Sequence, residues 1–523
     1  MSGKIELFDT TLRDGTQGEY INYSVEDKIR IAQRMDEFGI MYIEGGWPGS
    51  NPKDIAFFQR AKDLKFANAT ITAFGSTRHA RNAVESDPNI RALLESETKA
   101  VAIFGKSWDF HVTQALRIEL SDNLQMIRDS VGYLKSQGRK VIYDAEHFFD
   151  GYKNNPEYAL KTIQAASEAG AEVIALCDTN GGSLPHEISQ IARIAKANIS
   201  CKLGIHTHND SGCAVANTLA AVLEGAEHVQ GTFNGFGERC GNADLSSVVP
   251  NLMLKLGCEV VPMENLKELA GLALYIAELA NVQPKHNQPY VGMSAFAHKG
   301  GIHVSAVQRD SKTYEHIDPA LVGNRQRVLI SELSGQSNIL HKLKDMGIEL
   351  DKSSPVGRRI LEKIKQLESE GYYYETADAS LELLIRKELG QHRSFFQLVA
   401  YRVLVDQHHA SDDLWSEATV RVKIGDEVLF MAGDGDGPVN ALDNALRKAL
   451  EGHFPQLRDV RLTDFKVRII DSGQGTAAKT RVLIESSDGE REWITMGVSE
   501  NIIEASWDAL VDSIDYKLML DEK

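Results

Sequence analysis

The segment GIHTHND, residues 204–210, places His206 and His208 at alternate positions of a stretch that otherwise has the pattern of a buried strand. Alternate side chains of a strand point to the same face, so both imidazoles are expected on one side. Two imidazoles on one face suit neighbouring positions around a single metal ion. The spacing alone leaves another interpretation open, a core pair satisfied by hydrogen bonds, so the surrounding residues must decide.

Other polar side chains follow strand-like segments at their carboxyl ends. Arg13 and Asp14 follow the first such segment, and one of these two neighbours must lie beyond the strand. Asp144 and Glu146 share a face at the end of the fifth, while the sixth and eighth run into CDTNGG and NGFGERCGN. Carboxylates, arginine and amides are costly inside a purely structural core. Their recurrence at strand ends therefore indicates a functional site.

The elements that must position these residues alternate regularly from residue 4 to about 257. Eight strand-like segments are separated by amphipathic helical ones: IELFDTT, MYIEGGW, ATITAFG, KAVAIFG, KVIYDAE, EVIALCD, KLGIHTH and HVQGTFNG. Helical segments such as SVEDKIRIAQRMDEFG begin at a capping Ser and end at Gly. Eight βαβ-type units in about 250 residues predict a (β/α)8 TIM barrel, whose active site lies at the carboxyl ends of the strands. A doubly wound open sheet is the alternative, but no GxGxxG segment follows the first strand.

The remaining chain predicts two further parts. Residues 258 to about 395 have mostly helical patterns, ENLKELAGLALYIAELANV and DKSSPVGRRILEKIKQLESEG, with a turn expected at AHKGGIHVSA between them. From about residue 396, a unit of strands followed by a helix occurs twice. We expect an α/β barrel over 1–262, helical linker subdomains over 263–394 that complete the active site, and an α+β regulatory domain over 395–523. Such a symmetric repeat is suited to binding a partner, a second copy of itself or a small ligand.

Composition limits the classes of function. The net charge of −17 argues against a nucleic-acid-binding protein. No run of about 18 apolar residues predicts a membrane span, and the first residues do not have the pattern of a signal peptide. The five cysteines form no CxxC pair, which favours reduced thiols and a cytoplasmic protein.

Three motifs, DTTLRDGTQ, HTHND and GFGERCGNADL, resemble the family of 2-isopropylmalate, homocitrate and citramalate synthases, with 3-hydroxy-3-methylglutaryl-CoA lyases as more distant relatives. The resemblance covers nearly the whole chain. HKGGIHVSA and YEHIDPALVGNRQRVLISELSGQSN are similar to the helical subdomain of the synthases, and GDGPVNALDNAL to their regulatory domain. IEGGWPGSNPKD and VIYDAEHFFDGYK are most similar to the citramalate-forming members.

The resemblance implies a divalent metal ion, Mg²⁺ or Mn²⁺ with Zn²⁺ as the alternative. Its implied ligands are Asp14, His206, His208 and Asn242. One carboxylate, two imidazoles and one amide oxygen suit such an ion and leave positions for a 2-keto acid.

The resemblance also assigns roles around the substrates. Arg13 would contact the keto oxygen of the 2-keto acid, Thr179 its carboxylate, and Gln17 would lie near the thioester of acetyl-CoA. Asp144 is expected beside the substrate. The residues implied in proton transfer are Glu146, His303 and Tyr314. Family members commonly have GIHxDG where this chain has Ser305, so the group that orients His303 is left undefined.

The implied reaction condenses acetyl-CoA with pyruvate and hydrolyses the product to (R)-citramalate and CoA, an acyl transfer in isoleucine biosynthesis. Isoleucine is the expected allosteric effector at the carboxyl-terminal repeat, and a homodimer or higher homo-oligomer is expected. Trp47, Phe74 and Phe104 are candidates for restricting the pocket to pyruvate, or are ordinary core residues. The alternatives are a 2-isopropylmalate or homocitrate synthase, a lyase running the reverse cleavage, and a non-catalytic amino-acid sensor.

Overall fold

The computed structural model describes residues 3–307, 309–329, 343–344, 355–374, 376–407, 414–470 and 478–522. The chain divides into two compact units. The first comprises Met1–Phe296 with Ile317–Gln326, and the second comprises Ala297–His316 with Arg327–Lys523. Among the described residues, no helix is both long enough and apolar enough to cross a membrane.

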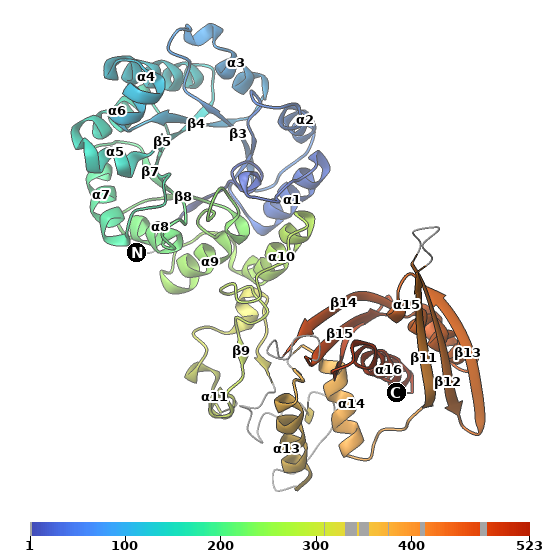
Figure 1. Cartoon of the computed structure of the whole chain (residues 1–523). Helices are drawn as coiled ribbons and strands as arrows, with labels where there is room; N and C mark the ends of the chain where they lie inside the picture. Colours follow the sequence, from blue (N-terminus) through green and yellow to red (C-terminus); the bar gives the residue numbers. More distant parts are fainter. Residues whose placement is uncertain are drawn as a thin grey trace. The chain divides into compact units, whose positions relative to one another are not determined.

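The first unit is built on eight parallel strands that close into a barrel, because β1 pairs with both β2 and β8. Figure 1 shows the ring of strands surrounded by helices. The strands are β1 Glu6–Asp9, β2 Tyr42–Gly46, β3 Thr70–Ser76, β4 Ala100–Lys106, β5 Lys140–Glu146, β6 Val173–Asp178, β7 Lys202–Thr207 and β8 His228–Gly231. The predicted TIM barrel is therefore confirmed, and the doubly wound alternative is wrong.

Each strand is followed by at least one helix, as the alternating pattern predicts. The helices are α1 Val25–Phe38, α2 Pro52–Ala61, α3 Pro88–Glu95, α4 Leu120–Ser136, α5 Phe148–Asn154, α6 Pro156–Ala169, α7 Pro185–Ala197, α8 Ala214–Leu223, α9 Leu245–Pro250 and α10 Leu269–Leu279. The predicted caps of α1 are present: Ser24 accepts a hydrogen bond from the Asp27 backbone, and Gly39 ends the helix in the left-handed conformation.

Two strands end earlier than the sequence predicts. β1 stops at Asp9 because the Thr10 carbonyl accepts hydrogen bonds from the backbone of Arg13 and Gly15, which starts a turn. β8 stops at Gly231, and the short 3-10 helix η4, Phe233–Gly235, follows it with Asn234 at a φ of 61°. Arg13 and Asp14 therefore both lie in the turn beyond β1, not at the end of the strand.

The barrel interior changes from apolar to polar along its axis. An apolar cluster fills the part of the interior nearer the amino ends of the strands: Phe8, Tyr42, Phe74, Ala100, Ala102, Ile142 and Val173. Two residues further along β2 and β5, on the same inward face, lie the buried carboxylates Glu44 and Asp144. This alternation places a polar layer at the carboxyl ends of the strands, where barrel active sites form.

The chain beyond the barrel is mostly helical, with two differences from expectation. The helix predicted over 264–282 is a 3-10 segment, η6 Met263–Glu268, followed by α10. The turn predicted at AHKGGIHVSA is largely helix α11, Gly301–Val307, because Val304 and Val307 are buried at helical spacing. Further described elements of this part include the two-residue strands β9 Ala297–His298 and β10 Arg327–Val328, and helices α13 Pro355–Ser369 and α14 Asp378–Glu388. The segments 330–338 and 351–354, which carried part of the expectation, lie outside the described residues.

The carboxyl-terminal part consists of the predicted repeat. Three antiparallel strands, β11 Gln397–Gln407, β12 Leu414–Ile424 and β13 Glu427–Gly435, precede helix α15, Pro438–Leu450. The second copy has β14 Arg461–Ile469, β15 Thr480–Ser487, β16 Glu492–Ser499 and helix α16, Ile502–Asp521. The two helices bury apolar faces against their own sheets, which confirms the α+β class of this part.

Candidate active site

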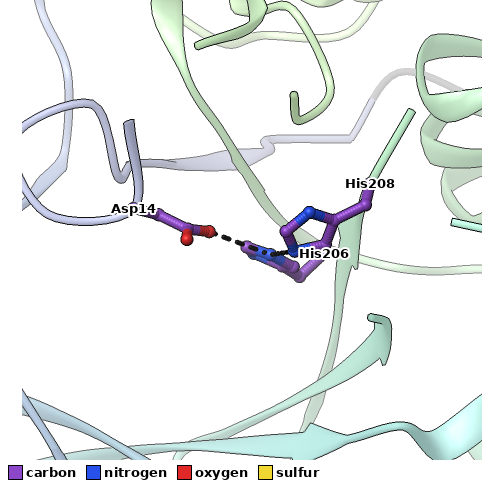
Figure 2. A group of neighbouring side chains, drawn as sticks. All are labelled: Asp14, His206 and His208. Carbon is purple, nitrogen blue, oxygen red and sulfur yellow. Dashed lines mark hydrogen bonds and ion pairs between the residues drawn. The ribbon is translucent and has the colours of Figure 1, made fainter. Parts of the chain in front are cut away.

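His206 and His208 converge on Asp14 at the carboxyl-terminal end of the barrel. The Nε2 atom of His206 lies 3.2 Å from Nε2 of His208 and 3.3 Å from Oδ2 of Asp14. Figure 2 shows the carboxylate and both imidazoles directed toward one another. All three residues are buried, and a ligand atom of each lies within 4.8 Å of the others. The three residues therefore form a group that could hold a metal ion.

Asp14 and His208 have protonation states that suit metal ligands. Burial alone would lower the pKa of His206, but the Asp14 and Asp144 carboxylates raise it overall. Burial, with the neighbouring His206, lowers the pKa of His208 to about 3, so its imidazole is neutral at neutral pH. Burial alone would raise the pKa of Asp14, but Arg13 and His206 lower it overall and keep the carboxylate ionised. A neutral imidazole and an ionised carboxylate are the forms that bind metal ions.

Asn242 provides the fourth predicted group. Its Nδ2 donates a hydrogen bond of 2.7 Å to Oδ2 of Asp14 and lies 3.4 Å from Nε2 of His206. Its Oδ1 is buried and has no hydrogen-bond partner. Rotating the amide by half a turn would exchange these atoms and direct the oxygen at the cluster. The donor set then comprises one carboxylate, two imidazoles and one amide oxygen, which fits a divalent cation.

Arg13 is held firmly beside this group. Its Nη1 lies 3.2 Å from Oδ1 of Asp14, and its Nε donates a hydrogen bond of 2.6 Å to Oε2 of Glu44. The guanidinium carbon lies 3.7 Å from the centre of the Phe74 ring. Burial raises the pKa of Glu44 to about 7 although Arg13 opposes that rise. The guanidinium therefore has a fixed orientation and a fixed positive charge.

A cavity of about 230 Å³ lies beside Asp14, His206 and His208. It is lined by Arg13, Asp14, Gln17, Trp47, Phe74, Phe104, Asp144, Glu146, Cys177, Thr179, His206, His208 and Glu238. All predicted site residues of the barrel except Asn242 line this cavity. Asn242 donates a hydrogen bond to Asp14, which does line it.

Aromatic rings form one wall of the cavity. Trp47 packs edge-on against Phe74 and Phe104 with ring centres 5.6 and 5.8 Å apart, while Phe74 and Phe104 stack at 5.6 Å. The indole Nε1 of Trp47 donates to Oδ1 of Asn89 at 2.8 Å, and its backbone N–H donates to Oδ2 of Asp54 at 2.9 Å. The wall is therefore rigid, and it limits the size of a ligand in the cavity.

Polar groups line other parts of the cavity. Glu146, at the end of β5, forms an ion pair with Lys106 at the end of β4. Thr179 accepts a hydrogen bond of 2.9 Å from the backbone N–H of His147 through its Oγ1. Gln17 is exposed at the rim. These groups can bind the oxygen atoms of a small polar ligand.

His303 and Tyr314 are placed in the second compact unit, not in the barrel unit. His303 is exposed on α11, and Tyr314 follows the 3-10 segment η7, Ser311–Thr313. Their rings pack with centres 4.3 Å apart. The structure thus brings these two predicted residues together, and Tyr314 contacts the imidazole whose orienting group the sequence left undefined.

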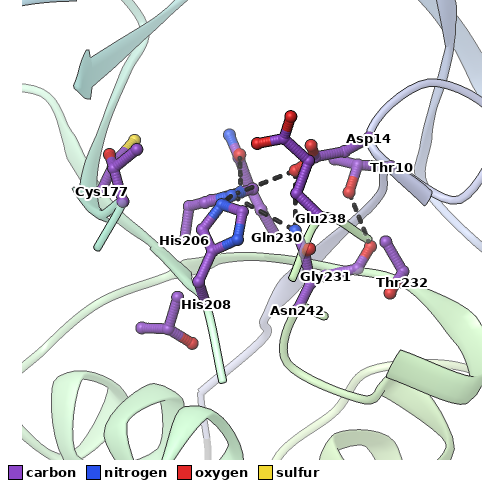
Figure 3. A network of polar contacts seen from close by, with 12 residues as sticks. Thr10, Asp14, Cys177, His206, His208, Gln230, Gly231, Thr232, Glu238 and Asn242 are labelled. Atoms are coloured by element: carbon purple, nitrogen blue, oxygen red, sulfur yellow. Dashed lines mark hydrogen bonds and ion pairs between the residues drawn. The ribbon is translucent and has the colours of Figure 1, made fainter. Parts of the chain in front are cut away.

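Sequence reasoning missed Glu44, Lys106 and Gln230. Gln230 lies in β8, and its Oε1 is 3.0 Å from Nδ1 of His206. Figure 3 shows the two side chains next to each other. A signal for Glu44 was present, because it is the single charged residue inside the apolar segment MYIEGGW. Gln230 lacked this signal, because HVQGTFNG also contains the polar residues His228, Thr232 and Asn234. A lone polar residue in a buried strand needs a partner, and here the partner belongs to the site.

The sequence also matches three described families. Residues 4–274 match the family described as HMGL-like. Residues 290–371 match the homocitrate synthase post-HMGL domain-like family, and residues 375–518 match the LeuA allosteric (dimerisation) domain. The (R)-citramalate synthase of Aquifex aeolicus is 56% identical over 100% of this chain and 99% of its own length. That of Geobacter sulfurreducens is 56% identical over 99% of this chain and 98% of its own length. A probable 2-isopropylmalate synthase of Methanopyrus kandleri is 31% identical over 98% of both chains.

Proposed function

The chain belongs to the (R)-citramalate synthases of the HMGL-like family, acyl-transferring barrel enzymes, and we propose that it condenses acetyl-CoA with pyruvate and hydrolyses the product to (R)-citramalate and CoA. One observation carries the proposal: Arg13, Asp14, His206 and His208 meet at one side of a small cavity that has an aromatic wall. This arrangement fits a short 2-keto acid bound through its oxygen atoms.

Asp14, His206, His208 and, after rotation of its amide, Asn242 would hold a divalent ion, Mg²⁺ or Mn²⁺ with Zn²⁺ as the alternative. Such an ion would supply a Lewis acid for the keto oxygen of pyruvate. Arg13 faces the same position with a fixed positive charge. Its guanidinium stabilises the negative charge that develops on the keto oxygen when carbon attacks the keto carbon.

The attacking carbon is the methyl group of acetyl-CoA, which must lose a proton first. We assign this proton to Glu146, because its carboxylate lines the cavity and is held by Lys106 at the end of the adjacent strand. A positioned base of this kind contributes about 10²–10⁴-fold to a rate. His303 and Tyr314 are assigned to the later proton transfers, in which the alkoxide gains a proton and water cleaves the thioester.

A second cavity of about 520 Å³ is proposed for the remainder of acetyl-CoA. It shares Phe104 with the first cavity and includes Lys106, the partner of Glu146. Its lining combines apolar Leu116 and Met126 with basic Arg78. This combination suits a thioester arm followed by phosphate groups.

We propose that the aromatic wall makes pyruvate the preferred keto acid. Trp47, Phe74 and Phe104 occupy the space that a longer side chain of the keto acid would need. The preference is tested by CoA release with pyruvate, 2-ketoisovalerate and 2-ketoglutarate, each with acetyl-CoA. We expect pyruvate to have the highest kcat/KM, by about 10-fold or more, since one or two methylenes change discrimination by about 1–3 kcal/mol. A preference for either larger acid would instead identify a 2-isopropylmalate or homocitrate synthase.

Regulation and assembly are assigned to the carboxyl-terminal repeat. The match to a LeuA allosteric (dimerisation) domain supports an amino-acid effector, for which we propose isoleucine, and a homodimer. Large apolar side chains are about half exposed on the face of its first sheet that points away from α15: Leu404, Trp415, Val428 and Phe430. Covering them with a second copy would remove apolar surface from water. Isoleucine is expected to inhibit CoA release more strongly than leucine or valine at equal concentration; equal or absent inhibition would contradict the assignment.

A further inference from the structure

Gln230 is a buried amide in the barrel interior, with 1% of its surface exposed. It lies on β8, which pairs with β7 in the register Gly204 to His228 and Ile205 to Val229. Continuing this register brings Gln230 level with His206. Both side chains point inward, so a contact between them is a direct result of the strand pairing.

The two ends of the Gln230 amide have different neighbours. Its Oε1 lies 3.0 Å from Nδ1 of His206. Its Nε2 donates a hydrogen bond of 2.8 Å to Oδ1 of Asp144 and lies 3.5 Å from Nε2 of His228. Because a carboxylate accepts hydrogen bonds, the amide nitrogen belongs on the Asp144 side and the amide oxygen on the His206 side.

This orientation determines which nitrogen of His206 carries the hydrogen. With Oε1 as the acceptor, Nδ1 of His206 is the donor, so Nε2 is the nitrogen that carries the lone pair in the neutral imidazole. That lone pair faces Oδ2 of Asp14 at 3.3 Å and Nε2 of His208 at 3.2 Å. If the Gln230 amide were reversed, its Nε2 would face Nδ1 of His206. The hydrogen of His206 would then be on Nε2, and that nitrogen could not bind a cation.

We propose that Gln230 is a positioning residue for the metal site: its amide, anchored on Asp144, holds the ring of His206 and its tautomer so that Nε2 is free to bind a divalent cation. A partner of this kind on a metal-bound histidine typically contributes about 10–100-fold to metal affinity. The inference rests on the proposed metal-dependent function, but its test measures ion binding and not turnover.

The test compares Mn²⁺ affinity, measured by isothermal titration calorimetry, for the full-length chain and three variants. Gln230→Met keeps the approximate size of the side chain and removes both hydrogen bonds. Gln230→Glu keeps an oxygen acceptor toward His206 and, protonated beside the Asp144 carboxylate, a donor toward Asp144. Asn217→Leu is the matched control, because it removes another fully buried amide of the barrel, whose Nδ2 donates to the Ser183 carbonyl at 2.8 Å.

We expect Gln230→Met to weaken Mn²⁺ binding about 10–100-fold, Gln230→Glu to recover most of that loss, and Asn217→Leu to bind like the wild type. Thermal unfolding of each ion-free variant verifies that the barrel is folded. A folded Gln230→Met variant that binds Mn²⁺ with wild-type affinity would overturn the inference and leave the proposed function standing. Equal losses in Gln230→Met and Asn217→Leu would overturn it too, since the effect would then be general. A wild-type chain that binds no Mn²⁺ would overturn both proposals.

Discussion

The Nε atom of Arg13 donates a hydrogen bond of 2.6 Å to Oε2 of Glu44, a carboxylate with no exposed surface. Arg13 lies in the turn after β1, while Glu44 lies two residues beyond Tyr42 on the inward face of β2. The guanidinium that we assign to the keto oxygen is thus anchored on a strand and not only on its neighbour Asp14. The anchor keeps the positive charge in place before substrate arrives, which is the condition for electrostatic stabilisation of a transition state.

Replacing Glu44 by Gln should lower kcat about 10-fold, because the amide oxygen still accepts from Nε of Arg13 but the carboxylate charge that strengthens this hydrogen bond by about 1.5 kcal/mol is lost. Steady-state kinetics with pyruvate and acetyl-CoA measures this loss. The matched control is Glu382→Gln, which changes another buried carboxylate paired with an arginine, Arg386, in the second unit. If both variants keep wild-type kcat, Glu44 does not position Arg13 for the reaction.

Replacing Glu146 by Gln should lower kcat about 10²–10⁴-fold, since an amide cannot accept the methyl proton of acetyl-CoA. Mn²⁺ affinity should be unchanged, because Glu146 is not among the metal-binding group. Glu187→Gln serves as the control, since Glu187 also pairs with a lysine, Lys153, at 2.9 Å. A Glu146→Gln variant with kcat within about 3-fold of wild type would exclude this carboxylate as the base.

Removing bulk from the aromatic wall should widen substrate choice. Trp47→Leu is expected to raise the kcat/KM ratio of 2-ketoisovalerate to pyruvate by about 10-fold or more, because space for about two methylenes becomes free. Phe110→Leu is the control, since Phe110 is 53% exposed and does not line the cavity. An unchanged ratio in the Trp47 variant would mean that other residues determine the size of the keto acid.

The second unit should have a pH-dependent stability that originates at Asp515. Burial raises the pKa of Asp515 to about 7, well above the value of about 4 expected in the unfolded chain. Between these two pH values the folded state therefore binds more protons than the unfolded state. The stabilisation that protonated Asp515 gives the fold is complete below about pH 4 and is lost as the pH rises through about 7.

Asp515→Asn keeps an oxygen to accept the hydrogen bond from His392, which lies 3.2 Å away, and removes the buried charge. The free energy of unfolding of the variant should exceed that of the wild type by about 1–3 kcal/mol at pH 8 and by almost nothing at pH 4. Calorimetric unfolding of the full-length chain at both values measures the difference. Asp434→Asn, at an exposed position of β13, is the control. Equal gains at pH 4 and pH 8 would contradict the assigned origin.

Most of the barrel could be predicted because short segments of the sequence specify its strands and the ends of its helices. Alternating apolar segments define the strands, and Ser24 with Gly39 defines the ends of α1. The site could be anticipated because barrel topology gathers the strand ends that carry Asp144, Glu146 and His206.

What could not be predicted depends on contacts between distant segments. The end of β8 depends on a left-handed Asn234, and α11 forms where two glycines suggest a turn. The roles of Glu44 and Gln230 follow from neighbours across the barrel, Arg13 and His206. No pattern within one strand specifies which partner such a residue meets.

The most direct test of the central claim is Mn²⁺ binding, measured by isothermal titration calorimetry, to the chelator-treated chain and to its His208→Ala variant, with CoA release followed on the same samples. We predict one ion per wild-type chain, loss of CoA release after chelation with recovery on adding Mn²⁺, and loss of both binding and turnover in the variant. Undiminished CoA release from the metal-free chain, or wild-type ion binding by His208→Ala, would contradict the account.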